Sequence, residues 1–328
     1  MRSPAGPLRF FTLTLAVCLL LTPLAAVSQT STPSVRVAFV TGVTPAPYVE
    51  AFRDGLRERG FIEGKNLVFD FRSADGEFDR VPVLAAEVLS RNPDVLVLTS
   101  TSALLAKQIA GKTPMIFVIA DDPVRAGLIR SYARPGGRVT GLTSLNLELD
   151  TKRLEMLKET MPGITRVGVI AAPQDTAHRE RIATIEKSAR TLALQLQLMN
   201  VNRADDVPRV FEAAAHAHVG AVMLLGAPPL LRYQTQILEM ATKARLPLVA
   251  GWSEFAEQGA LMSYGTNVSA MFRHAATIAS RILKGANPAD IPVERATTFE
   301  LVVNRKTAQA LRIDIPAAVM VRADRLIE

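Results

Sequence analysis

The sequence predicts an α/β protein with two similar lobes, each built around a parallel sheet with helices on both faces. Its strand candidates are continuous runs of β-branched and other apolar residues, which is typical of strands covered on both sides. Amphipathic helical segments alternate with these strands, and that alternation favours a doubly wound sheet. The pattern starts again at residue 166, which indicates a second lobe.

The first half of the chain contains five predicted strands and the helices between them. The strands are expected at residues 35–40, 66–71, 94–99, 115–120 and 138–143. The helices are expected at residues 48–59, 81–90, 103–109 and 124–133. In the first of these helices Val49, Phe52 and Leu56 share one face, as in a helix that packs on a core.

The second half repeats this architecture without repeating the sequence. A helix at residues 149–161 is expected to cross from one lobe to the other. The strands are expected at residues 166–171, 196–201, 221–226, 247–251, 260–265 and 299–304. The helices are expected at residues 176–193, 206–216, 230–244, 268–283 and 306–311.

The first 28 residues have the layout of a secretory signal peptide. Arg2 and Arg9 precede an apolar run at residues 10–21, and a zone of small residues follows. The run is about half of the ~20 residues that a membrane-spanning helix needs. The only cysteine, Cys18, lies inside this segment in a context that argues against a lipid anchor. We therefore expect a periplasmic protein that carries no disulfide after cleavage.

The bulk composition excludes several classes of protein. With 328 residues and 48% hydrophobic residues, the chain can form large cores, which rules out global disorder. The formal net charge of +7 is dispersed along the chain, whereas nucleic-acid binding needs a concentrated basic surface. We expect a monomer that binds no nucleic acid. No second apolar run is long enough to cross a bilayer.

Hydroxyl groups follow one of the predicted strands directly. Ser100, Thr101 and Ser102 come after the strand at residues 94–99 and open the next helix. Ligands of doubly wound sheets bind at the carboxyl ends of strands, and the free amides of a helix N-terminus favour an anion. An ordinary helix cap needs only one hydroxyl. The sequence therefore predicts a site for a ligand carboxylate at this strand end.

A pair of carboxylates follows the next strand. Asp121 and Asp122 precede Pro123, which can occupy the first position of a helix. We expect one aspartate to cap that helix. Whether the other pairs with a ligand ammonium stays open at this point.

Aromatic residues also gather at strand ends. Trp252 and Tyr264 each lie at the end of a predicted strand, and Tyr48 follows the loop after the first strand. Several amphipathic aromatics in such positions suit the wall of a pocket. Thr41, which begins the first loop, completes the set of expected ligand-binding residues.

Motifs of catalysis and cofactor binding are missing from the sequence. It has no G-x-G-x-x-G after the first strand, no P-loop, no G-x-S-x-G and no H-E-x-x-H. The four histidines lie in or directly after predicted helices, away from the carboxyl ends of the strands. We expect no enzyme activity, no metal site and no cofactor.

Several long segments resemble one family of transport proteins. The segments D-P-V-x-A-G-L at residues 122–128, R-P-G-G-x-V-T-G at residues 134–141 and G-A-L-x-S-Y-G at residues 259–265 carry the resemblance. Similar stretches occur at residues 50–76, 83–108 and 153–170. In these features the chain resembles the ABC-transporter substrate-binding proteins of the tryptophan/tyrosine-binding type, over essentially its whole mature length.

The resemblance implies a periplasmic binding protein of the type I fold, with two Rossmann-like lobes that close on a ligand across a hinge. The implied ligand is a small amino-acid-like molecule, and the implied partner is an ABC permease in the inner membrane. We expect residues 35–145 with about 268–292 in the N-terminal lobe, and residues 146–267 with about 293–328 in the C-terminal lobe. The alternatives are a secreted ligand-sensing partner of a membrane receptor and, less favoured, an exported α/β enzyme.

We predict that export removes the signal peptide between about residues 26 and 28, because the small-residue zone lies there. N-terminal sequencing of the periplasmic protein should start between Val27 and Gln29. Recovery of the full-length chain from the cytoplasm alone would contradict this prediction.

Overall fold

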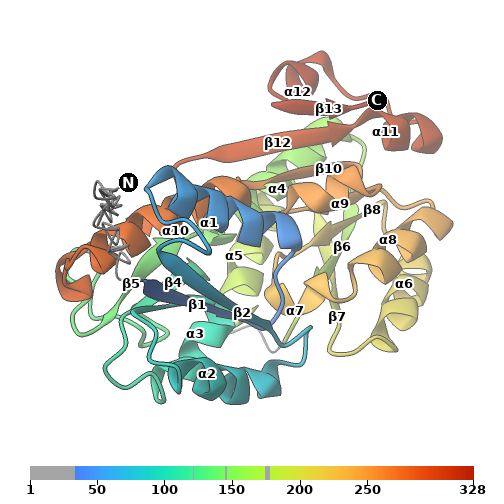
Figure 1. Cartoon of the computed structure of the whole chain (residues 1–328). Helices are drawn as coiled ribbons and strands as arrows, with labels where there is room; N and C mark the ends of the chain where they lie inside the picture. The colour runs from blue at the N-terminus through green and yellow to red at the C-terminus, as the bar shows by residue number, and fades with distance from the viewer. Residues whose placement is uncertain (1–33, 121, 145, 174–177) are drawn as a thin grey trace, which may run out of the picture. The chain divides into compact units, whose positions relative to one another are not determined.

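The computed structural model describes residues 34–120, 122–144, 146–173 and 178–328 (Figure 1). These residues form one compact unit that contains two separate β-sheets. Each sheet is associated with its own set of helices, and the chain passes between the two sheets three times.

The first sheet has six strands, and every pair of neighbouring strands is parallel. In sheet order the strands are β11 (Glu294–Arg295), β5 (Val139–Thr143), β4 (Met115–Ala120), β3 (Val95–Thr99), β1 (Val35–Thr41) and β2 (Leu67–Ser73). The predicted strands of the first half are therefore all present, within one or two residues of the expected bounds.

The second sheet has seven strands, of which only β10 and β12 pair in antiparallel fashion. In sheet order they are β13 (Arg325–Ile327), β12 (Phe299–Asn304), β10 (Met262–Thr266), β9 (Leu248–Ala250), β8 (Ala221–Leu224), β6 (Arg166–Ala171) and β7 (Gln195–Asn200). The runs β2-β1-β3-β4-β5 and β7-β6-β8-β9-β10 have the same doubly wound order, so the two halves share one topology.

The helices alternate with the strands as expected. They are α1 (Ala46–Glu58), α2 (Val81–Leu89), α3 (Ser100–Lys107), α4 (Asn146–Thr160), α5 (His178–Thr191), α6 (Asp206–His216), α7 (Pro228–Leu231), α8 (Gln234–Lys243), α9 (Ser253–Glu257), α10 (Val268–Leu283), α11 (Arg305–Leu311) and α12 (Ala317–Val321). Within the described residues, no helix is both long enough and apolar enough to cross a membrane.

Aromatic rings fill the core between the first sheet and its covering helices. Phe39 of β1 contacts Phe52 of α1 edge to face and stacks on Phe272 of α10, with ring centroids 5.7 Å apart in both pairs. α1 packs along α10 on this face, as Figure 1 shows. α2 and α3 cover the opposite face, where their alanines and Val81 join a separate apolar cluster. The first sheet is thus covered on both faces, which explains the apolar character of its central strands β1, β3 and β4.

Hydrogen bonds tie together the three segments in which the chain crosses between the sheets. Thr266, at the end of β10, donates from its hydroxyl to the carbonyl of Ser144, 2.9 Å away. The amide of Asn267 donates to the carbonyl of Thr298 at 3.0 Å. The amide of Ala296 donates to the carbonyl of Thr143 at 2.8 Å. The three crossings therefore run side by side.

Two predicted helices differ from the structure. Residues 124–133 form turns instead of a helix. The carboxylate of Asp122 accepts hydrogen bonds from the amides of Val124 and Arg125 as a helix cap would, but Gly127 takes a left-handed conformation, which does not continue a helix. The helix expected at residues 230–244 is divided into α7 and α8 by Tyr233. That residue has a non-helical backbone, and its buried side chain donates to the carbonyl of Asn202.

A buried ionic network holds the second lobe together. Asp150 and Arg153 of α4 and Arg181 of α5 are all at most 1% exposed. The carboxylate of Asp150 accepts from Nε of Arg181 at 2.7 Å and from its Nη2 at 3.0 Å, and it also pairs with Nη1 of Arg153. Beyond the aspartate, Arg153 donates to the carbonyl of Tyr264 and Arg181 donates to that of Gly226. The network therefore joins two helices to the ends of β8 and β10.

Two glycines leave room for this network. A Cβ atom on Gly251 would lie 2.6 Å from Nη2 of Arg153, and one on Gly265 would lie 1.8 Å from the carbonyl oxygen of Gly251. Both distances are shorter than atoms tolerate. Glycine at these two positions lets the guanidinium of Arg153 reach the strand ends.

We predict that Asp150→Ala lowers the free energy of unfolding by about 3–5 kcal/mol, because it removes the carboxylate from between two buried guanidinium groups. Urea unfolding followed by circular dichroism measures the loss. The matched control is Glu155→Ala on the same helix, which breaks an exposed pair with Lys152 and should cost at most ~1 kcal/mol. Equal losses in the two variants would contradict the prediction.

Candidate ligand-binding cleft

The strand order places one candidate site in each sheet. The chain leaves β1 to one side for β2 and returns on the other side as β3, and it repeats this move at β6, β7 and β8. Such switch points open a crevice at the carboxyl ends of the two neighbouring strands. The candidate walls therefore lie at the ends of β1 and β3 and at the ends of β6 and β8.

On the first wall, threonine hydroxyls bond to each other. The hydroxyl of Thr41 is fully buried and lies 2.7 Å from that of Thr44 and 2.9 Å from that of Thr99. These contacts join the end of β1 to the end of β3 and to the loop between β1 and α1. The contacts that the structure shows for the Thr41 side chain are therefore structural.

Ser102 fixes the same loop from the other side. Its hydroxyl is buried and accepts a hydrogen bond from the amide of Gly42 at 2.8 Å. A Cβ on Gly42 would lie 2.2 Å from the ring of Phe78, so the loop also packs tightly on its outer side. The Ser102 hydroxyl thus orients the β1–α1 loop, and its expected contact with a ligand carboxylate stays a prediction.

The main chain of Ser100 and Thr101 forms the first turn of α3, directly after β3 and without an intervening loop. The carboxyl end of β3 thus continues into a helix N-terminus, where amides and the helix dipole favour an anion. The expected aspartate pair is divided: Asp122 caps the turn at residues 122–125, and Asp121 lies outside the described residues.

On the second wall, an aromatic side chain follows β9. Trp252 is 6% exposed, and its ring stacks on that of Phe255, with the centroids 6.2 Å apart. Gly226, which follows β8, lies against the indole, because a Cβ at that position would be 3.5 Å from its ring. Trp252 therefore lies beside the carboxyl end of β8, and its role as a wall residue stays a prediction.

Trp252 and Tyr264, which were both expected to cover the ligand side chain, pack into different apolar clusters. Tyr264 packs against the cluster formed by α4, α5 and their face of the second sheet, whereas Trp252 belongs to the large cluster that contains α6, α8 and α9. Successive side chains of a strand point to opposite faces, and Tyr264 follows Met262 onto the α4 face. A strand-end position alone does not decide which face an aromatic covers.

Tyr48 joins α1 to the second lobe. Its buried ring stacks on Phe272, with centroids 5.7 Å apart and planes 14° apart. Burial and the facing carboxylate of Glu254 raise the pKa of the Tyr48 hydroxyl above its ordinary range. Burial also raises the pKa of Glu254, although its interaction with Tyr48 opposes that shift. Among the described residues, Oε2 of Glu254 is buried without a hydrogen-bond partner.

Sequence reasoning missed several residues that shape the walls. They are Asp150, Arg153, Arg181, Glu254 and Arg232. The spacing of Asp150 and Arg153 is that of an exposed helical ion pair, and the sequence carries no signal that this pair is buried. Glu254 and Arg232 act across long sequence separations, which no local pattern reveals.

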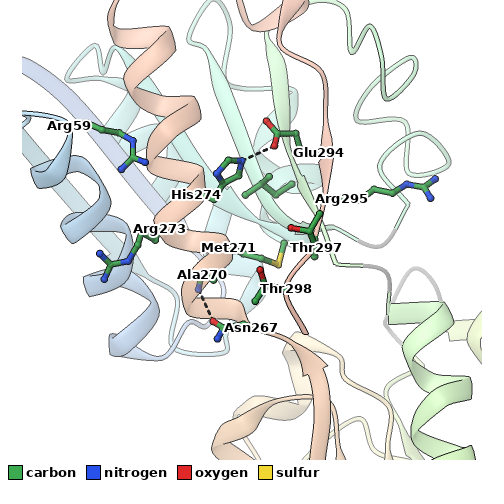
Figure 2. A pocket seen from close by; sticks show the side chains of 12 residues that line it. Arg59, Asn267, Ala270, Met271, Arg273, His274, Glu294, Arg295, Thr297 and Thr298 are labelled. Atoms are coloured by element: carbon green, nitrogen blue, oxygen red, sulfur yellow. Dashed lines mark hydrogen bonds and ion pairs between the residues drawn. The ribbon is translucent and has the colours of Figure 1, made fainter. Parts of the chain in front are cut away.

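A separate pocket of about 400 Å³ lies beside the crossing segments. Figure 2 shows its lining, which comes from α10, the residue after α1 and residues 294–298. Nε2 of His274 lies 2.7 Å from Oε2 of Glu294 at this pocket. None of the expected ligand-binding residues lines it, so it is distinct from the strand-end walls. Within the described ranges, no group of three or more histidine, cysteine or carboxylate side chains is arranged to hold a metal.

Two sheets with the same doubly wound strand order have the architecture of the type I periplasmic binding fold. The chain belongs to the ABC transporter substrate binding protein family, whose sequence model matches residues 35–327. By that description the family consists of substrate-binding proteins of ABC transporters. The predicted family and the predicted two-lobed α/β fold are both confirmed.

Individual relatives agree with this assignment. The chain is 26% identical to the tyrosine-binding protein of Clostridioides difficile over 266 residues, which is 80% of this chain and 75% of that protein. A Vibrio cholerae conserved domain protein of known structure is 29% identical, with a TM-score of 0.82 over 89% of this chain and 99% of that one. The crystal structure of an ABC domain from Streptococcus pneumoniae in complex with L-Trp is 22% identical, with a TM-score of 0.82 over 90% of this chain and all of that one.

We predict that Glu254→Gln raises the melting temperature by about 2–4 °C at neutral pH. Because the pKa of Glu254 is raised in the folded state, ionisation costs stability as the pH rises through the unfolded and then the folded pKa. The rise in melting temperature should be full above the pKa of Glu254 in the folded state. It should vanish below the pKa of glutamate in the unfolded chain, about 4.3. Thermal unfolding across pH tests this, with exposed Glu212→Gln as the control. A gain independent of pH would contradict the assignment.

Proposed function

We propose that this protein is the extracytoplasmic solute-binding component of an ABC importer. It traps a small amino-acid-like ligand between its two lobes, and the aromatic amino acids are the first candidates. The names of two relatives support this choice, since one is a tyrosine-binding protein and the other was crystallised with L-Trp. Closure would follow from contacts that the ligand makes with both lobes.

One observation carries the proposal: the switch points of two sheets with the same order provide walls of complementary chemistry. The first wall offers the N-terminus of α3 for a carboxylate, with Thr41 and Ser102 holding the adjacent loop. The second wall offers the indole of Trp252, and Tyr48 and Glu254 lie where the lobes meet. An amino acid with an aromatic side chain carries groups for both walls.

The proposal includes a place and a partner. The signal-peptide layout of the first 28 residues supports delivery to the periplasm. There the protein would act as a monomer and pass its ligand to an ABC permease in the inner membrane. It would need no cofactor and bind no nucleic acid.

Calorimetric titration with the twenty standard amino acids tests the ligand class. We expect saturable one-to-one binding of L-tyrosine or L-tryptophan, and native mass spectrometry should return the ligand unchanged. Chemical turnover of the bound molecule would identify an enzyme and overturn the proposal. Binding of a small molecule that is not an amino acid would overturn the proposed ligand class but not the solute-binding function.

We predict that Ser100→Ala and Thr101→Val each weaken amino-acid binding by about 10- to 100-fold, because each removes a hydroxyl from the proposed carboxylate site. Titration of the purified variants measures the loss. Ser90→Ala, which removes a hydroxyl at the end of α2, is the matched control and should bind as the wild type does. Unchanged affinity in both site variants would move the carboxylate elsewhere in the cleft.

A further inference from the structure

Arg232 reaches from the second lobe to the first. It lies between α7 and α8, and its Nη1 donates to the carbonyl of Gly76 at 2.7 Å. Gly76 belongs to the loop after β2, on the first sheet, and Figure 1 shows α7 beside the end of β2. The guanidinium also lies over the ring of Tyr233, 5.3 Å from its centroid, which orients it. The contact therefore joins the two lobes directly.

Gly76 is adapted to this contact. Its φ of +89° is in the region that favours glycine, and a Cβ there would lie 3.0 Å from Nε of Arg232. The residue is buried, so its carbonyl oxygen needs a hydrogen-bond donor. In the structure Arg232 supplies that donor.

Gly76 is also connected to the first wall of the cleft. Its amide donates to the carbonyl of Gly42 at 2.8 Å, and the amide of Gly42 donates to the hydroxyl of Ser102 at 2.8 Å. Ser102 is the third residue of α3. A continuous chain of hydrogen bonds therefore runs from Arg232 of the second lobe to the helix N-terminus of the first.

We propose that Arg232 is a positioning residue that holds the lobes together over the ligand and does so through the loop that shapes the carboxylate site. This inference rests on the proposed binding function. Correct placement of the β1–α1 loop keeps the carbonyl of Gly76 in reach of Arg232, so site geometry and lobe closure are coupled. Ligand affinity then depends on Arg232 through the population of the closed state.

An ion pair between the lobes is of a different kind. Arg125, in the turn after β4, pairs with Glu180 of α5, and the two side chains are 63% and 39% exposed. Exposed pairs of this kind contribute little because solvent screens them. Arg232 instead satisfies a buried carbonyl, so its loss leaves a desolvated acceptor unless the lobes separate.

The test compares Arg232→Ala, Arg232→Lys and the control Arg209→Ala, which removes an exposed arginine from the same lobe. Affinity for L-tyrosine and L-tryptophan is measured by calorimetry. Lobe separation is measured by electron–electron distance spectroscopy between spin labels at Lys112 and Glu212. These positions are exposed, and the only cysteine of the sequence, Cys18, lies in the predicted signal peptide, so the labels of the mature chain attach only to the two introduced cysteines.

We expect Arg232→Ala to weaken binding about 3- to 10-fold, which is less than a buried charged hydrogen bond would give, because the Arg232 side chain is exposed to solvent. The distance distribution should broaden toward open lobes. Arg232→Lys should recover part of both effects, and Arg209→Ala should change neither.

Unchanged affinity and an unchanged distance distribution in Arg232→Ala would overturn the inference. If neither amino acid binds the wild-type protein, the proposed ligand class is wrong. The spin-label distance distributions of the ligand-free proteins then test whether Arg232 holds the lobes together. A shift of the spin-label distance toward open lobes in Arg232→Ala, with no shift in Arg209→Ala, then supports the role of Arg232. Distance distributions of Arg232→Ala and the wild type that are identical refute it.

Discussion

The carboxylate of Asp150 holds the second lobe in the shape on which its wall depends. It lies between two buried guanidinium groups, and charges at that depth are stable only when they are paired and hydrogen-bonded. Arg153 and Arg181 extend the pairing to the carbonyls at the ends of β10 and β8. One acidic side chain therefore sets the positions of two helices and two strand ends.

The first lobe achieves the same rigidity with neutral groups. Threonine hydroxyls join β1 to β3, and Ser102 holds Gly42 from the start of α3. Buried hydroxyl networks of this kind specify one arrangement, because each broken bond leaves an unsatisfied polar group. The two walls are thus both pre-formed, one by an ionic network and the other by hydroxyls, and a ligand need not order either of them.

The contacts between the lobes are less complete than the contacts within them. Glu254 is buried against Tyr48, yet one of its oxygens has no hydrogen-bond partner among the described residues, and burial raises its pKa. Arg232 satisfies one carbonyl across the boundary from a partly solvated position. If the lobes separate and rejoin as the proposed function requires, modest contacts suit them, since a strongly favoured closed state would hinder ligand entry and release.

The sequence by itself determined the order of elements, the parallel character of the sheets and the family. Local periodicity was sufficient for this: α6 and α10 begin and end at the predicted residues, because their apolar faces follow the helical repeat. It also placed Thr41 and Trp252 at strand ends. Only the tertiary structure decided that Tyr264 faces the α4 side of its sheet, because neighbouring elements determine which face of a strand packs where. The burial of Asp150 and the reach of Arg232 to Gly76 were likewise decided by tertiary structure, since both depend on segments that meet only when the chain has folded.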